Sequence, residues 1–485
     1  MLPLAAHGQT YFNERYSNPT GRTQTAFLSI APTDSGYVAV GTTRDYPTAG
    51  EKALTLRFLT PTGQQDQAYY SYGRLSPGWA NAFHRLPDGR YVLVGQRTVP
   101  GTFRGYTVLL RFNAIGDTLW TRRFARGSGE SGLSMCVLPD GGFAIIGSMA
   151  TGTSTDPFQD IVLTRTDSAG NLLWWKKYDN LIQDYGWTIT STADGGFLLG
   201  GYSYDLTQTD SFVVKTDSLG NRQWQRTFGS PTLSDGLTAV CALRDGTYLL
   251  ASSYGTRVVA GTTQYRHIVY HLDSAGGLLS SRRYGPEGDV QELYVIHELA
   301  DGSVVIAGQQ SDSTPAQMPE AVIFKLCPDG EEVWYRTYKK LLGPNSHNYL
   351  RDLRPTPDGG FVAAGFLFAN PPDLGSSDGW VFKVDSAGYV QAGGAVVTNP
   401  CRPVGLGEAG AGPAREVAVW PNPAADGRFT VRVGGQAAAG GSGAARATLT
   451  VCDALGRVLL RQPAGGAGAE TRVDLSAQPP GLYLL

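Results

Sequence analysis

The sequence predicts an all-β protein in which a seven-bladed β-propeller is followed by a small β-sandwich. Three observations predict this fold. A short Asp-Gly motif recurs seven times, a second motif ending in Gly keeps step with it, and 63 of the 485 residues are Gly in a chain also rich in Thr, Val and Tyr. Such a composition favours short strands joined by turns over helices.

The first motif, "DGGFAIIG" from Asp140, recurs at intervals of 54, 52, 54, 51, 56 and 57 residues along the chain. This period is typical of propeller blades. An Asp in a Gly-rich loop could ligate a metal or activate a water, but Asp-Gly between apolar runs is also a strong hairpin signal. Because the motif recurs at a near-constant period, we interpret Asp140 as a turn residue. The seven copies begin at Asp34, Asp88, Asp140, Asp194, Asp245, Asp301 and Asp358.

The second motif reads "DSAG" in its commonest form, as in "TDSAG" ending at Gly170, and is followed in most copies by a short strand that carries Trp. Each repeat therefore offers four short strands, and it can bury both faces only by stacking against its neighbours. The Asp of this motif is expected to cap a turn. Its copies end at Gly63, Gly116, Gly170, Gly220, Gly276, Gly330 and Gly388, and the Trp residues are Trp120, Trp174, Trp224 and Trp334.

The last repeat lacks a recognisable fourth strand, whereas the chain begins with "TYFNERY", residues 10–16, which resembles one. We expect this segment to complete the last blade, because ring closure removes exposed sheet edges. The propeller is therefore assigned to residues 9–397. The two tight turns of each repeat should lie on one side of the disc. The variable loops, among them the one that starts at Ser253, and the connections between blades should lie on the other. A ligand is expected on that second side or at the mouth of the central channel.

Charge and cysteine content narrow the function classes. With 40 Lys and Arg against 42 Asp and Glu, the chain has no basic excess for nucleic acid or anionic membranes, and no apolar window is long enough for a membrane helix. The five cysteines are isolated and odd in number, so no disulfide framework or metal knuckle is expected from them. Cys136 and Cys241 occupy equivalent strand positions and are interpreted as small buried residues.

No catalytic, cofactor or metal residue is predicted. The six histidines form no zinc-binding motif, and His267 and His271, four residues apart on one strand, would lie roughly 13 Å apart, too far to share a metal. "GLGEAG", residues 405–410, matches the GxGxxG dinucleotide pattern but has no strand before it and no helix after it, so we exclude a cofactor there.

A Gly, Pro and Ala-rich linker, residues 398–416, leads into the tail, residues 417–485. The tail contains "WPNP", "DALGRV" and "PPGLYLL" and resembles the type A C-terminal sorting domain of the Bacteroidetes type IX secretion system. That resemblance implies an Ig-like sandwich, export through the periplasm, the secretion machinery as a partner, and a secreted or surface-anchored protein. The motif residues are Pro421, Asn422, Pro423, Asp453, Gly456, Arg457, Gly481 and Tyr483.

Both ends of the sequence carry an expectation. Residues 1–8 lead through Ala6-His7-Gly8 and resemble the tail of a secretory signal peptide, so we interpret them as its remnant. The sorting domain normally continues past Gly-x-Tyr into a last strand, which we expect to be missing after Leu485.

Two functions remain open from the sequence. The first is a non-enzymatic secreted propeller that binds a glycan, a protein or a surface polymer through its variable face, and it is favoured because no repeat carries a distinctive catalytic insert. The second is a secreted hydrolase or lyase acting on polysaccharide, which would need convergent carboxylates about 5 to 9.5 Å apart.

Overall fold

The computed structural model describes residues 9–17, 22–45, 52–71, 78–99, 105–127, 129–150, 159–311, 318–342, 346–368, 377–392 and 401, and six short segments between 417 and 484. The chain divides into two compact units, residues 1–401 and 402–485. All described regular structure is β-strand, arranged in many four-stranded sheets as in a β-propeller. The all-β prediction is confirmed.

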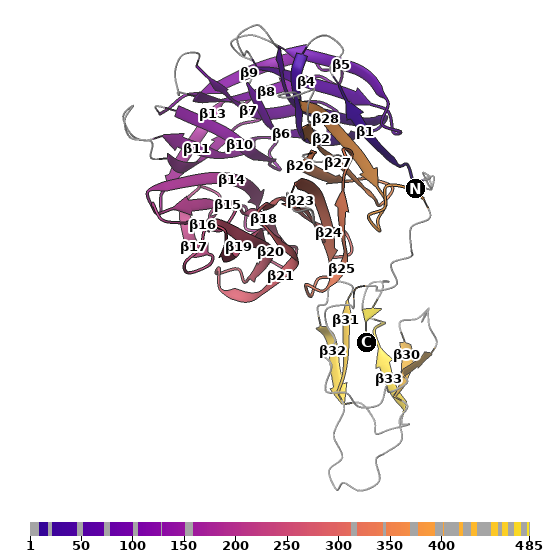
Figure 1. Ribbon diagram of the computed structural model, residues 1–485. Helices are drawn as coiled ribbons and strands as arrows, with labels where there is room; N and C mark the ends of the chain where they lie inside the picture. Colours follow the sequence, from indigo (N-terminus) through magenta and orange to yellow (C-terminus); the bar gives the residue numbers. More distant parts are fainter. Residues whose placement is uncertain are drawn as a thin grey trace. The chain divides into compact units, whose positions relative to one another are not determined.

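The larger unit contains five separate four-stranded antiparallel sheets, each formed by strands consecutive in the chain (Figure 1). Their strands are β6 (Trp79–Arg85), β7 (Tyr91–Thr98), β8 (Gly105–Phe112), β9 (Thr118–Phe124); β10 (Gly129–Val137), β11 (Phe143–Ala150), β12 (Gln159–Thr166), β13 (Leu172–Tyr178); β14 (Gln183–Ser191), β15 (Phe197–Tyr204), β16 (Thr209–Thr216), β17 (Arg222–Phe228); β18 (Ala239–Ala242), β19 (Tyr248–Val259), β20 (Thr262–Leu272), β21 (Leu278–Gly288); and β22 (Gln291–Glu298), β23 (Val304–Ser311), β24 (Pro319–Leu326), β25 (Glu332–Tyr338).

An eight-stranded sheet joins the two ends of this unit. One half is β2 (Arg22–Thr33), β3 (Gly36–Asp45), β4 (Lys52–Leu59) and β5 (Gln65–Ser71), and the other is β26 (His347–Pro355), β27 (Phe361–Phe368), β28 (Ser377–Val384) and β1 (Phe12–Tyr16). A single parallel bridge, Gln24 to Ser377, connects the halves. The N-terminal strand β1 pairs antiparallel with β28, from Phe12 opposite Lys383 to Tyr16 opposite Gly379.

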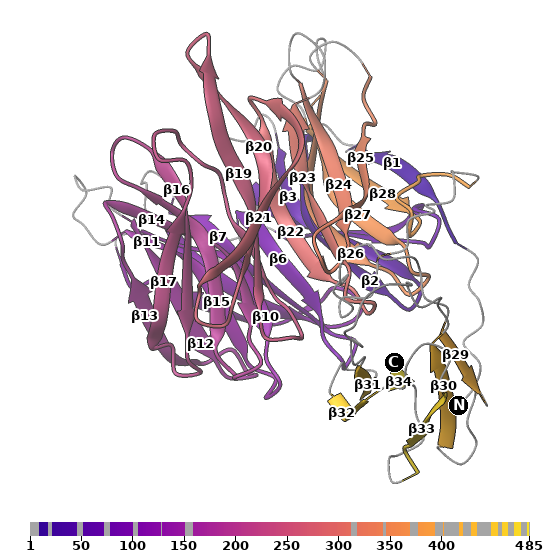
Figure 2. The same ribbon diagram turned by 90° about the horizontal axis from the view of Figure 1, so that it is seen from below.

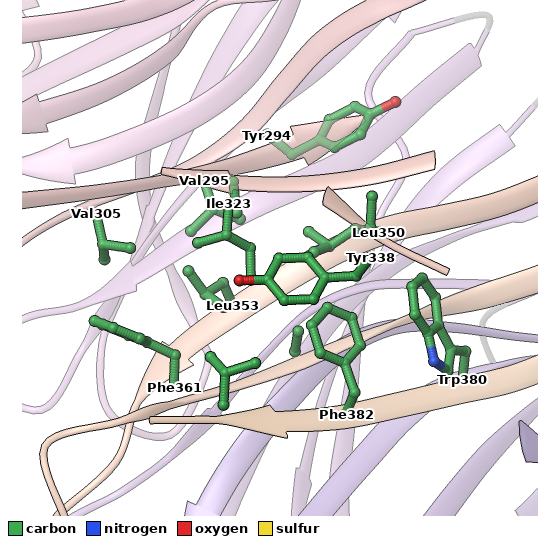
Figure 3. Packing of buried hydrophobic residues seen from close by; sticks show 14 of the residues in the cluster. Tyr294, Val295, Val305, Ile323, Tyr338, Leu350, Leu353, Phe361, Trp380 and Phe382 are labelled. Atoms are coloured by element: carbon green, nitrogen blue, oxygen red, sulfur yellow. The ribbon is translucent and has the colours of Figure 1, made fainter. Parts of the chain in front are cut away.

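The first strands of the sheets contact one another in a closed series: β2, β6, β10, β14, β18, β22, β26 and back to β2. Apolar residues on both faces of the sheets fill the space between neighbours. Figure 3 shows one such cluster, in which Tyr338, Phe361, Trp380 and Phe382 pack together, while Tyr294 lies at its border with the hydroxyl pointing away. The core is thus divided into layers between sheets, which explains why one repeat alone could not bury its faces.

The Asp-Gly motif forms the turn between the first and second strands of a sheet, as predicted. In "LPDGG" the Leu138 carbonyl accepts from Gly141 N at 2.8 Å, and Leu138 N donates to the Gly142 carbonyl at 2.9 Å. Gly141 has φ 78°, a backbone conformation that is unfavourable for any residue that has a Cβ atom. The loop is therefore a three-residue hairpin with Gly at the left-handed position.

Neighbouring sheets are joined by hydrogen bonds from Tyr residues of their fourth strands. The Tyr178 hydroxyl donates to the Gly220 carbonyl of the next sheet at 2.7 Å, and Tyr338 donates to Gly388 at 2.8 Å. Strand β1 makes the same contact, because Tyr16 donates to Gly63. The Phe12 ring packs against Gly63 at the place where Trp residues pack in other sheets. The N-terminal strand thus closes the unit with the contacts of an internal fourth strand.

One predicted variable loop is instead an extended hairpin. The segment from Ser253 continues β19 and β20 through a tight turn in which Ala260 and Gly261 have φ of 50° and 83°. This hairpin projects beyond the neighbouring sheets in Figure 2. The alternation of Thr, Val and Tyr there was a strand signal that the loop prediction overlooked.

The described residues contain one disulfide, which could not be read from the cysteine spacing. Cys327, at the start of the turn between β24 and β25, is bonded to Cys401, with a Cα–Cα distance of 5.0 Å. Isolated cysteines 74 residues apart in the sequence gave no spacing signal for this pair. Cys136 and Cys241 are free and lie on the first strands β10 and β18, where burial raises the pKa of their thiols to about 12 and about 11.

The smaller unit contains two three-stranded sheets. Val431, Val451, Val473 and Leu475 form a buried cluster with strands of both sheets. The order is β29-β30-β33 in one sheet and β32-β31-β34 in the other: β29 (Val417–Trp420), β30 (Arg428–Val433), β31 (Thr448–Asp453), β32 (Val458–Pro463), β33 (Glu470–Asp474) and β34 (Tyr483–Leu484). The expected signal-peptide remnant, residues 1–8, lies outside the described residues.

Candidate functional site

Two of the predicted sorting-motif residues lie on adjacent strands. Asp453 on β31 is the register partner of Tyr483 on β34, so the second and third motifs meet in one sheet. The others, Pro421, Asn422, Pro423, Gly456, Arg457 and Gly481, lie outside the described residues.

The turn side of the larger unit, where both tight turns of each sheet lie, is built from repeated structural contacts. The Asp of the first turn holds its own turn and pairs with a Lys or Arg on the third strand. Asp140, for example, accepts from Gly142 N at 3.0 Å and pairs with Arg165. The pairs are Asp88–Arg111, Asp140–Arg165, Asp194–Lys215, Asp301–Lys325 and Asp358–Lys383. These cations were not singled out from the sequence, although each stands at the same place in the second motif.

The Asp residues of the second turn are structural as predicted. Asp167 Oδ1 accepts from Ala169 N at 2.9 Å and Asn171 N at 2.7 Å. Hydrogen bonds from the Asn171 side chain and backbone lower the pKa of Asp167. Asp217 repeats this pattern with Leu219 and Asn221.

A central cavity of about 320 Å³ is lined by the first strands of the sheets. Most of these strands carry a β-bulge at an equivalent position, and each bulged residue lines the cavity. The bulges break the registers of β2, β6, β10, β14, β22 and β26. The residues that they direct inward are Leu28, Asn81, Leu133, Trp187, Tyr294 and Arg351.

Three of these bulged residues, Trp187, Tyr294 and Arg351, lie next to one another, so that two aromatic rings and a guanidinium group form a row. The Trp187 and Tyr294 ring centroids are 6.3 Å apart, and the Arg351 guanidinium lies 4.6 Å from the Tyr294 ring centroid and 5.5 Å from that of Phe366. Phe366 stacks on Tyr349 at 4.8 Å. We call Trp187, Tyr294, Arg351, Phe366 and Tyr349 the aromatic arc. Flat faces with a nearby guanidinium suit a ligand that stacks on the rings and accepts hydrogen bonds.

Deeper toward the turn side, the cavity is lined by His84, His297, Asp352 and Arg354. Nε2 of His84 donates to the Met135 carbonyl at 3.0 Å, and Nε2 of His297 donates to the Leu353 carbonyl at 2.9 Å. Burial lowers the pKa of both imidazoles to about 4. At neutral pH both rings are therefore uncharged donors that link neighbouring first strands.

Asp352 is the one carboxylate among the described residues that line this cavity. It accepts from Ser29 Oγ at 2.7 Å and Ile30 N at 3.0 Å and pairs with Arg354 at 3.2 Å. The side chain is therefore fully engaged in joining β26 to β2.

A second cavity of about 510 Å³, the side cleft, lies on the crossover side, where each sheet connects to the next. Trp187 lines both cavities, so the side cleft adjoins the aromatic arc. Its other lining residues are Tyr202, Thr209, Asp235, Gly236, Leu237, Ser253, Tyr265, Asp289, Val290, Gln291 and Glu292.

Asp235 sits at the crossover between β17 and β18 and holds the backbone there. Its Oδ2 accepts from Ser230 N at 2.6 Å and its Oδ1 accepts from Gly255 N at 2.9 Å. Asp184 and Asn348 cap the crossovers of two other sheets in the same way. Burial, together with the nearby Asp210 carboxylate, raises the pKa of Asp235 to about 7, and burial also raises the pKa of Asp210.

Asp210 is a departure from the repeat. Other acidic residues near the start of a third strand pair with a cation of the fourth strand or just after it: Asp160 with Lys177 at 2.7 Å, Glu320 with Lys339 at 3.3 Å, and Asp378 with Arg15. In the β14–β17 sheet the corresponding positions are Thr227 and Gly229. Asp210 therefore faces Asp235 instead of a cation.

Among the described residues no group of three His, Cys, Asp or Glu is placed to hold a metal ion. His267 and His271 both lie on β20 but bond elsewhere, His267 Nδ1 with the Tyr335 hydroxyl at 3.1 Å and His271 with Thr247 at 2.8 Å. No helix in the described segments is long and apolar enough to span a membrane.

Sequence reasoning missed the aromatic arc and the side cleft. Their residues come from different repeats and carry no shared motif, so only their positions in the sheets bring them together. One signal was available: the bulge position carries Leu in two repeats and Asn in one, but Trp187, Tyr294 and Arg351 in three others.

No protein-family model matches the sequence, and no curated protein matches it. Solved structures with a similar strand arrangement include a Bacteroides caccae protein of unknown function (15% identity, 60% of this chain and 92% of that chain, TM-score 0.36). A Penicillium chrysogenum α-L-arabinanase complexed with arabinobiose is also similar (16%, 63% and 92%, TM-score 0.42). So is Chaetomium thermophilum Sqt1 bound to the N-terminus of ribosomal protein L10 (9%, 76% and 98%, TM-score 0.41).

Proposed function

We propose that this chain is an exported seven-bladed β-propeller that binds a glycan through its crossover side without cleaving it. The aromatic arc carries this proposal. Trp187, Tyr294 and Arg351 come from three different sheets and line the central cavity, and the Phe366 ring packs against the Arg351 guanidinium. Sugar rings stack on such faces through their C–H groups, and a guanidinium donates to their hydroxyl oxygens.

The seven-blade count follows from dividing the eight-stranded sheet into two blades. Its halves share one parallel bridge, whereas strands within each half pair over most of their length. The closed series of first-strand contacts supports this division.

We propose export by the type IX secretion system, with residues 417–485 as an Ig-like sorting domain and the secretion machinery as its partner. The adjacency of Asp453 and Tyr483 supports a common structural role for two of the three motifs. The Cys327–Cys401 disulfide supports an oxidising compartment, as expected for a secreted or surface-anchored protein.

Binding without cleavage is supported by the chemistry of the central cavity. Asp352 is already engaged by Ser29, Ile30 and Arg354, and both histidines are uncharged donors to carbonyl groups. The alternative, a polysaccharide hydrolase or lyase, is favoured by one observation, namely that Asp289 and Glu292 both line the side cleft.

The test is a polysaccharide array with the full chain, scored for retention and for release of reducing ends. Trp187→Leu is the informative variant, because Leu28 and Leu133 stand at the same bulge position in other sheets and the fold should tolerate it. We expect Trp187→Leu to weaken retention about tenfold, equivalent to about 1.4 kcal/mol. Trp175→Ala, which removes an exposed Trp on the outer strand β13, is the control and should bind normally.

Equal retention by Trp187→Leu and the wild type would contradict the proposed binding surface. Release of reducing ends that is abolished by Glu292→Gln would establish the hydrolase alternative.

A further inference from the structure

Arg351, the bulged residue of β26, lines the central cavity with a guanidinium that has no hydrogen-bond acceptor among the described residues. Its Nε is buried, and none of its three side-chain nitrogens forms a hydrogen bond or an ion pair within the described segments. A buried donor left in this state destabilises the fold, and an acceptor supplied by a bound molecule would relieve that destabilisation. The unpaired nitrogen is therefore a sign of a ligand in addition to the aromatic faces.

Other arginines show that the state of Arg351 is unusual. Three further Arg side chains among the described residues have one buried nitrogen without a partner, but each binds an acceptor through its other nitrogens. These pairs are Arg57–Gln65, Arg111–Asp88 and Arg126–Glu130. The Arg351 guanidinium instead lies over two rings, 4.6 Å from the Tyr294 centroid and 5.5 Å from the Phe366 centroid. Aromatic faces stabilise its charge but leave the N–H groups in the guanidinium plane available as donors.

The charges that line the central cavity favour an anion. Its charged lining residues, among those described, are two Arg and one Asp, an excess of one positive charge, and both lining imidazoles are uncharged at neutral pH. Asp352 and Arg354 pair with each other at 3.2 Å, so the excess charge is that of Arg351. Glu292, which accepts from the Tyr294 hydroxyl, lines the side cleft and forms no ion pair with Arg351. The cavity therefore offers one unpaired cation beside the stacking faces.

We propose that the central cavity binds an acidic polysaccharide, with Arg351 holding the carboxylate of a uronic acid residue and the aromatic arc stacking on the sugar rings. This inference rests on the proposed glycan binding and names its substrate class. A planar carboxylate matches the fork of guanidinium donors and can accept two parallel hydrogen bonds from it. A sugar with a hydroxymethyl group in place of the carboxylate would still stack but would lose this charge-assisted contact, which is the basis for selectivity.

Calorimetric titration of the full chain tests the proposal with matched pairs of oligosaccharides. The probes are hexasaccharides of galacturonate, mannuronate and glucuronate, each beside its carboxyl-reduced neutral form, at neutral pH and low ionic strength. We expect at least one acidic member to bind about tenfold more tightly than its neutral form. Because the contact joins two charges, added salt should reduce this preference and leave the affinity of the neutral form nearly unchanged.

Arg351→Leu is the informative variant, because Leu28 and Leu133 occupy the same bulge position in other sheets and the fold should tolerate it. It should reduce the affinity for the acidic hexasaccharide to that of its neutral form. Arg351→Lys, which keeps the charge but loses the fork, should retain only part of the preference. Arg123→Leu is the matched control and should leave the preference unchanged. This Arg also lies over a ring, 3.9 Å from the Tyr106 centroid, but on the outer strand β9 and not in the cavity lining.

A purely structural role for Arg351 predicts a different result. If the guanidinium only holds the rings of the aromatic arc in place, Arg351→Leu weakens the acidic and the neutral hexasaccharide by the same factor. If the guanidinium binds a carboxylate, the acidic member loses much more affinity than the neutral one, and the salt dependence of its binding disappears. An equal loss for both members of every pair would overturn the proposal.

The outcomes distinguish this inference from the proposed function. Equal affinity for the acidic and neutral members of every pair, with each weakened by Trp187→Leu, would retain glycan binding and reject the uronate site. Failure of every oligosaccharide and polysaccharide to bind would reject the proposed function and this inference with it. A glutamate-rich peptide that binds as tightly as the best acidic hexasaccharide, in a manner dependent on Arg351, would overturn the assignment to a sugar.

Discussion

The turn side and the crossover side of the larger unit differ in how closely the sheets repeat one another. On the turn side, an Asp in the first turn pairs with a third-strand cation in five sheets. On the crossover side, an acidic residue near the start of the third strand pairs with a fourth-strand cation in some sheets, but Asp210 does not. The residue at the bulge position also varies, from Leu to Trp, Tyr and Arg. A contact required by the fold is repeated, so the departures from repetition are the better guide to a ligand site.

The repeated pairs occupy the same place in each sheet but differ in burial. The side chains of Lys383 and Asp358 are 0% and 10% exposed, whereas those of Arg111 and Asp88 are 16% and 44% exposed. Water screens an exposed ion pair, so losing that pair changes the free energy of unfolding little. A buried cation that loses its partner lowers the free energy of unfolding much more. The ion pairs of the turn side should therefore repeat the same structure in each sheet but contribute different amounts to the free energy of unfolding.

Asp358→Ala has the largest expected effect on this comparison. Among the described residues, it leaves the Val384 carbonyl as the remaining hydrogen-bond acceptor of the buried Lys383 ammonium, so we expect a loss of about 3 to 5 kcal/mol in the free energy of unfolding. Asp88→Ala, the matched change at an exposed copy, should cost less than about 1 kcal/mol. Denaturant unfolding monitored by Trp fluorescence measures both losses of stability. Equal losses would mean that burial does not determine how much each ion pair stabilises the fold.

The Cys327–Cys401 disulfide is an exception on the turn side, because Cys327 stands where other sheets have the capping Asp of the second turn. Closing a segment of 74 residues is expected to stabilise the unit by about 2 to 4 kcal/mol, mainly through the unfolded chain. The double variant Cys327→Ser/Cys401→Ser should lose this amount. Reductant should lower the melting temperature of the wild type to that of the variant and leave the variant unchanged; an equal response of both would place the effect elsewhere.

The pH dependence of stability should have opposite signs on the two sides. Burial holds the pKa of His84 and His297 at about 4, below the ordinary value of 6.5, so the unfolded chain binds more protons between these values. Their contribution is complete above pH 6.5 and is lost as the pH falls toward 4, by roughly 1.4 kcal/mol per pH unit for each fully buried ring. Asp235, with its pKa raised to about 7, contributes stability at low pH that is lost as the pH rises from about 4 to 7.

Variants separate these two opposing slopes. His84→Asn should flatten the loss of stability between pH 6.5 and 4.5, and Asp235→Asn should remove the loss between pH 4.5 and 7. Thermal melts across this range give both slopes relative to the wild type. A steeper acid-side loss in His84→Asn than in the wild type would contradict the neutral-donor role of this imidazole.

The repeated features were predictable from the sequence because each depends on residues close together in the chain. The turn roles of Asp140 and Asp167 follow from Gly and Asn a few positions away, and the strand count within each repeat follows from the spacing of the motifs. The disulfide, the aromatic arc and the side cleft depend on which residues of different repeats meet in space. Trp187, Tyr294 and Arg351 are 57 or more residues apart in succession, and only ring closure and the bulges bring them together.

Tyr16→Phe has the smallest expected effect. It tests whether the hydrogen bond of the N-terminal strand stabilises the unit as much as the equivalent bond between other sheets. It removes the hydroxyl that donates to the Gly63 carbonyl and leaves the Phe12 contact in place. We expect a loss of about 1 kcal/mol, and Tyr338→Phe, which removes the same bond from β25 to Gly388 of the next sheet, should cost a similar amount. A much larger loss for Tyr16→Phe in equilibrium unfolding would mean that the N-terminal strand is the weakest joint of the ring, since opening there frees β1 from both β28 and the neighbouring turn.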